Sequence, residues 1–156
     1  MSFRELSAWL SVVTTIGVWG YYFLTLLGAF NAGTLNGDAT LKLFIGCMIA
    51  TIVVQVALNI VASIISRQDS MAPLDEREWR IDARATKIGI LILEWLMLAI
   101  ALSAWTLSSR VMEAFPADPG GGFALVFGNI VVLAVVFTET VRELAKGVQF
   151  RIDAVA

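Results

Sequence analysis

Two carboxylates lie in or beside apolar stretches of this sequence, where an ionised side chain is costly. Glu94 interrupts an apolar run that begins at Ile88, and Glu139 lies a few residues before the end of a second one. An ionisable side chain in hydrocarbon costs at least about 2.5 kcal/mol, so each glutamate requires a partner or a function. Two carboxylates held close together in a low dielectric cannot both ionise comfortably. One of them could then carry a proton.

A polar stripe runs along another apolar stretch, at positions four residues apart that share one face of a helix. Its members are Thr51, Gln55, Asn59 and Ser63. If the helices converge, Asn59 lies at nearly the depth of Glu94. The predicted site for a proton, a cation or another small ligand therefore consists of Glu94, Glu139, Asn59 and Gln55. Oxygen ligands alone would favour a hard cation.

A structural interpretation of the same residues stays open. Glu139 can pair with Arg142 one turn later and reach the membrane interface. Glu94 can be protonated and hydrogen-bonded to Asn59 or Gln55 from a neighbouring helix. Amide side chains in membrane helices commonly hold helices together rather than bind ligands.

Composition decides what kind of element must position these groups. Of the 156 residues, 58% are hydrophobic and 15% are charged, and the mean hydropathy is +0.81. A water-soluble core of this size could not bury so much apolar surface, so the excess must face lipid. The chain has no histidine and a single cysteine, Cys47. These absences exclude histidine-ligated haem or zinc and histidine-dependent catalysis. Acid-base chemistry would have to rest on Glu94 and Glu139 alone, so we expect no enzyme, no cofactor and no metal site.

Four apolar runs are long enough to cross the roughly 30 Å of membrane hydrocarbon. They cover about residues 6–33, 43–66, 88–109 and 122–144, and all three prolines lie between them. The sequence thus predicts an all-α membrane protein with a four-transmembrane-helix bundle. It forms a single integral membrane domain over residues 1–156, with a polar loop at 67–87.

The distribution of basic residues predicts the orientation, because Lys and Arg are retained on the cytoplasmic side. Only two basic residues, Lys42 and Arg110, belong to the side opposite the two termini and the 67–87 loop. Nine of the eleven basic residues belong to the N-terminus, the 67–87 loop and the C-terminal tail: Arg4, Arg67, Arg77, Arg80, Arg84, Lys87, Arg142, Lys146 and Arg151. Both termini and this loop should therefore be cytoplasmic, in a bacterial inner membrane.

The 67–87 loop carries the signals of a helix that continues into the third span. Pro73 suits a first helical position, and acidic residues follow it where the helix dipole favours them. We expect a helix from near Pro73 that extends the third span into the cytoplasm by about a third of its length. Its candidate docking residues are Asp75, Glu76, Arg77, Arg80 and Arg84. The alternative is a solvated helix start with a Glu76 to Arg80 pair. Interleaved acidic and basic residues argue against nucleic-acid binding.

The string Asp75-Glu76-Arg77-Glu78, followed by Ile81 and by Arg84-Ala85 ahead of a span, resembles a group of small uncharacterised prokaryotic four-span membrane proteins. Those proteins carry an Asp-Glu-Arg motif before their third helix. The resemblance covers about a dozen residues and the hydropathy profile. It implies the four-span layout and a bacterial setting, and it assigns no catalytic role to any residue.

Two functions fit these features. The preferred one is a non-enzymatic membrane protein that oligomerises, or that docks a soluble or membrane protein through its cytoplasmic loop. Small residues such as those of Gly46-xxx-Ala50 would allow close helix packing, including a homo-oligomer seam. The alternative is a small proton- or cation-coupled transporter or channel that uses the intramembrane Glu94.

Overall fold

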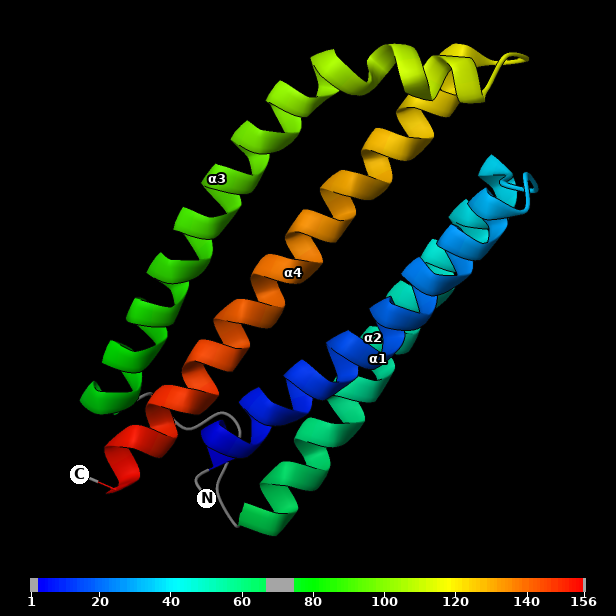
Figure 1. Ribbon diagram of the computed structural model, residues 1–156. Coiled ribbons are helices and arrows are strands. Elements are labelled where there is room, and N and C mark those ends of the chain that lie inside the picture. Colours follow the sequence, from blue (N-terminus) through cyan, green and yellow to red (C-terminus); the bar gives the residue numbers. More distant parts are fainter. Residues whose placement is uncertain (1–2, 67–74, 156) are drawn as a thin grey trace. The chain divides into compact units, whose positions relative to one another are not determined.

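The chain folds into four long α-helices (Figure 1). The computed structural model describes residues 3–66 and 75–155, and no strand occurs among them. The helices are α1 (Phe3–Asn31), α2 (Gly37–Ser66), α3 (Glu76–Ala114) and α4 (Pro119–Val155). Each contains a stretch that is long and apolar enough to cross a membrane. This confirms the all-α membrane fold and the four predicted helices.

The turn between α1 and α2 satisfies the backbone at both helix ends. The Gly33 N–H donates to the Phe30 carbonyl (3.1 Å) and the Thr34 N–H to the Ala29 carbonyl (3.0 Å). These two bonds form a Schellman motif, and Gly33 provides its left-handed residue with φ at 67°. Asn36 then caps α2, because its Oδ1 accepts from the N–H of Asp38 (2.9 Å). The cap begins α2 ahead of its apolar core.

Helix α3 begins with a side-chain cap. Asp75 Oδ1 accepts a bond from the Glu76 N–H (2.7 Å), and Glu78 Oε2 accepts one from the Asp75 N–H (3.3 Å). The second bond is the return half of a capping box. The predicted start near Pro73 lies outside the described residues. From Glu76 onward α3 runs for 39 residues, or about 58 Å.

Helix α4 begins at Pro119, earlier than its predicted apolar span. Asp118 Oδ1 accepts a bond from the Gly121 N–H (2.9 Å), and proline suits the first helical position. Gly122 lies against the Phe115 ring so closely that a Cβ would collide with it. Although Gly122 lies in a regular helix, its position must be a glycine because Phe115 of the preceding turn occupies the space of a Cβ.

The chain divides into two compact units. Unit 1 comprises residues Met1–Ala85 and Thr140–Ala156, and unit 2 comprises Thr86–Glu139. In unit 1, α1 and α2 pack through aromatic side chains. The Trp19 and Phe44 ring centroids are 5.7 Å apart, and those of Trp19 and Tyr22 are 5.6 Å apart. Tyr22 is only 1% exposed. Burial of these large side chains fixes the pairing of the two helices.

Unit 2 contains α3 from Thr86 to its end and α4 from its beginning to Glu139. The rings of Phe123 and Phe127 stack one turn apart on α4, with centroids separated by 4.3 Å. Large apolar side chains point outward along both helices, including Trp95 (66% exposed) and Trp105 (88% exposed). Such exposure is expected of helices whose surroundings are lipid rather than water.

Candidate functional site

Charged side chains gather where the start of α1, the start of α3 and the end of α4 meet, all within unit 1. We call this group the charged cluster. Its members are Arg4, Glu5, Arg77, Glu78, Asp82, Glu143, Lys146, Arg151 and Asp153. Figure 1 shows these helix ends on the side where both chain termini lie.

Two ion pairs connect α3 with α4. Lys146 Nζ lies 2.6 Å from Asp82 Oδ1 and 3.0 Å from Glu143 Oε1, so one ammonium bridges both helices. Arg77 Nε lies 3.4 Å from Asp153 Oδ2. The Lys146 side chain is only 18% exposed, which shields its bonds from water more than those of an ordinary surface pair.

Two further pairs attach the start of α1. Arg4 Nε lies 3.4 Å from Glu78 Oε2 on α3, and Arg151 Nε on α4 lies 3.9 Å from Glu5 Oε1. Glu5 is 6% exposed, and a buried carboxylate requires positive or hydrogen-bonding partners. Each exposed pair contributes about 0–1 kcal/mol, so the pairs chiefly set which helix ends meet.

A close apolar contact lies among these charges. A Cβ built on Gly147 of α4 would lie 2.9 Å from Trp9 Cε2 and 3.1 Å from Trp9 Nε1. Such distances are possible only because Gly147 has no side chain. On α3, Ile81 is 3% exposed and Ala85 is fully buried. Glycine and alanine thus allow the helix backbones to approach closely.

Three of the predicted docking residues lie at the start of α3, and each has a different role there. Asp75 caps the helix, Glu76 is exposed, and Arg77 belongs to the charged cluster. The sequence identified this string of residues but did not predict the separate role of each one. The predicted Glu76 to Arg80 contact takes a different form, since Arg80 Nε donates to the Glu76 main-chain carbonyl (3.4 Å).

Much of the remaining circumference of this part of α3 is exposed. It carries Arg80 and Arg84, one helical turn apart, together with Trp79, whose side chain is 62% exposed. We call Trp79, Arg80 and Arg84 the outer face of α3. Trp79 was not among the predicted docking residues. The helical spacing of Trp79 from the apolar Ile81 and Ala85 could have identified it, because this spacing places Trp79 on the side of the helix away from them.

The predicted intramembrane site is divided between the two units. Asn59 Oδ1 accepts a 2.6 Å hydrogen bond from Ser7 Oγ, which ties α2 to α1, and Gln55 is half-buried on the same helix. Glu94 and Glu139 belong to unit 2, and both are exposed. Their convergence with Asn59 and Gln55 stays a prediction. The bond from Ser7 gives Asn59 a structural role between helices.

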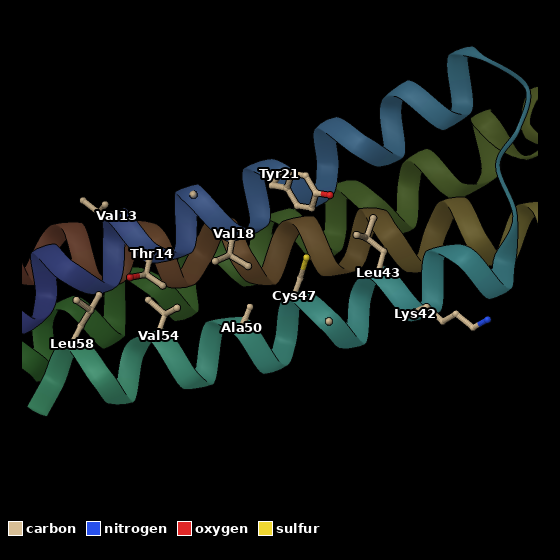
Figure 2. A pocket seen from close by; sticks show the side chains of 12 residues that line it. Val13, Thr14, Val18, Tyr21, Lys42, Leu43, Cys47, Ala50, Val54 and Leu58 are labelled. Carbon is tan, nitrogen blue, oxygen red and sulfur yellow. The ribbon is translucent and has the colours of Figure 1, made fainter.

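An apolar groove of about 740 Å³ lies between α1 and α2 (Figure 2). Gly17 and Gly46 line it, and no atom lies within 4 Å of a Cβ built on either. The predicted small-residue motif Gly46-xxx-Ala50 therefore borders open space between these two helices. Lys42 lies at one end of the groove.

Comparisons of the chain with protein-family models, with curated proteins and with solved structures find no match. The resemblance of the Asp75-Glu76-Arg77-Glu78 string to small four-span membrane proteins stays a prediction. Within residues 3–66 and 75–155, no group of three or more His, Cys, Asp or Glu side chains could hold a metal ion.

Proposed function

We propose that the protein is a non-enzymatic component of a bacterial inner membrane that docks a second protein at its cytoplasmic face. In this proposal both termini are cytoplasmic, and the amino-terminal part of α3 extends beyond the bilayer. The charged cluster then forms a cytoplasmic head. The observation that carries the proposal is that ion pairs hold Glu78 and Asp82 to α1 and α4, whereas Trp79, Arg80 and Arg84 are exposed.

The depth of the outer face favours a protein over lipid headgroups. The headgroup layer adds about 5–8 Å to each side of the hydrocarbon. If the hydrocarbon begins near Ile88, Arg84 lies about 6 Å beyond it and Trp79 about 13 Å beyond it. Arg84 can therefore reach lipid phosphates, whereas Trp79 extends past them. A large exposed aromatic side chain beyond the headgroup layer is well placed to contact a protein partner.

The residues of the outer face define the chemistry of the partner. Tryptophan and arginine are the residues most enriched among those that dominate protein interfaces. Arg80 and Arg84 present two guanidinium groups one turn apart, which suits carboxylates on an acidic partner surface. We therefore expect a protein with an acidic patch beside an apolar pocket that receives the Trp79 ring.

The test is photo-crosslinking in membranes of the source organism. A photoreactive amino acid at position Trp79 should give one protein adduct of defined mass. The same amino acid at Ile81, which is 3% exposed, should give none to another protein. Because charge reversal replaces attraction by repulsion, the double variant Arg80→Glu with Arg84→Glu should lower the adduct yield at least about tenfold. Adducts to lipid alone, or equal yields with and without the charge reversal, would exclude docking at this face.

Transport through Glu94 is the second candidate, and the exposed carboxyl of Glu94 within an apolar stretch of α3 favours it. A transporter reconstituted in liposomes should show pH-dependent proton or cation flux, and Glu94→Gln should abolish it while the protein stays folded. For a docking protein, we expect no flux from either form and a normal yield of folded Glu94→Gln. Flux that requires Glu94 would make transport the function.

A further inference from the structure

We propose that the groove between α1 and α2 binds an anionic phospholipid, with an acyl chain along the groove and the phosphate at Lys42. The inference is independent of the docking proposal, because it concerns a different part of unit 1. It requires only that α1 and α2 lie in a bilayer, as their length and hydropathy indicate.

The shape of the groove suits a flexible chain. Its volume of about 740 Å³ is within the range of sites for small organic ligands. Gly17 on α1 and Gly46 on α2 keep it open, because neither has a side chain and nothing occupies the space a Cβ would take. Cys47 and Thr14 are buried at the floor, at 5% and 6% exposure. Val54 and Leu58 continue the apolar lining (Figure 2).

Lys42 provides the charge at the end of this groove. Figure 2 shows its side chain extending past the end of the groove that is nearer the α1–α2 turn. Helix α2 has 30 residues and spans about 45 Å, so a centred 30 Å hydrocarbon layer begins about 8 Å from each end. Lys42 is five residues past Gly37, which places it at this boundary. A lysine at this depth faces the phosphate layer.

The same lysine argues against a second copy of the chain as the occupant. Closed dimers in a membrane are related by a two-fold axis along the membrane normal, so identical residues meet at the same depth. A dimer seam through this groove would bring two Lys42 ammonium groups together at the edge of a low dielectric. Their repulsion would oppose the seam, whereas a phosphate would neutralise each charge.

The test uses lipids that carry a photoactivatable diazirine in the acyl chain, in vesicles that contain the purified full-length protein. The phosphatidylglycerol probe should label α1 and α2 residues lining the groove. Lys42→Gln should lower its labelling about threefold or more and leave labelling by a zwitterionic phosphatidylcholine probe unchanged. Gly46→Leu should lower labelling by both probes, because the new side chain fills the groove. Gly28→Leu is the matched control, since its Cβ also meets nothing within 4 Å and Gly28 does not line the groove.

Three results would overturn the inference. Labelling confined to other helix faces would show that the chain does not enter the groove. Equal lipid labelling of Gly46→Leu and Gly28→Leu would also show that the acyl chain does not enter the groove. A fall in oligomer mass caused by Gly46→Leu, with no change in lipid labelling, would identify a second copy as the occupant. Because Gly28→Leu carries the same added side chain, a general loss of folding is recognised by its effect on both variants.

Discussion

Gly147→Leu is expected to destabilise the protein by about 1–3 kcal/mol, the usual range for overpacking a close contact. The first atom of the new side chain would lie 2.9 Å from the bulky Trp9 ring, so something must shift. Either the Trp9 ring rotates out of its packed position or the α1 and α4 helix ends separate, which would strain the ion pair between Glu5 and Arg151. In detergent, the purified variant should unfold about 3–10 °C below the wild type.

Gly28→Leu serves as the control for this prediction. Gly28 is also in a helix, and no atom lies within 4 Å of the Cβ that leucine would add. Leucine has the higher helix propensity, so the control should unfold at or slightly above the wild-type temperature. If Gly147→Leu unfolds at the same temperature as Gly28→Leu, then Trp9 and Gly147 are not in contact.

Helix number and type could be predicted from the sequence because they depend on local properties. A run of apolar residues without proline forms a helix in lipid whatever its neighbours are, and four such runs are present. The helix ends were predicted less well. The caps at Asn36 and Asp118 begin α2 and α4 before their apolar cores, because a polar cap extends a helix beyond the stretch that hydropathy detects.

The charged cluster could be predicted only in part. The sequence identified the charged string before the third span because its residues are adjacent along the chain. It did not indicate Glu5, Lys146 or Asp153, whose partners are far away in sequence and meet them only after the helices pack. Any of the acidic residues could have paired with any basic residue on charge alone. Tertiary packing selects the pairs.

In the docking proposal, one short string at the start of α3 serves two purposes. Asp75 and Glu78 stabilise the helix start, and Glu78 also accepts the Arg4 contact from α1. These bonds fix the rotation of α3 about its axis. The outer face is consequently presented in a single orientation, which lowers the entropy lost when a rigid partner surface binds.

The most direct test of the account is the side of the membrane on which the charged cluster lies. In a Cys47→Ala background, single cysteines are placed at Glu76, exposed at the start of α3, and at Thr34, exposed in the α1–α2 turn. A membrane-impermeant maleimide is then added to intact spheroplasts. We expect labelling of Thr34→Cys at once and of Glu76→Cys only after the membrane is permeabilised. Labelling of Glu76→Cys in intact spheroplasts would contradict the account, because the head and its outer face would then lie outside the cell.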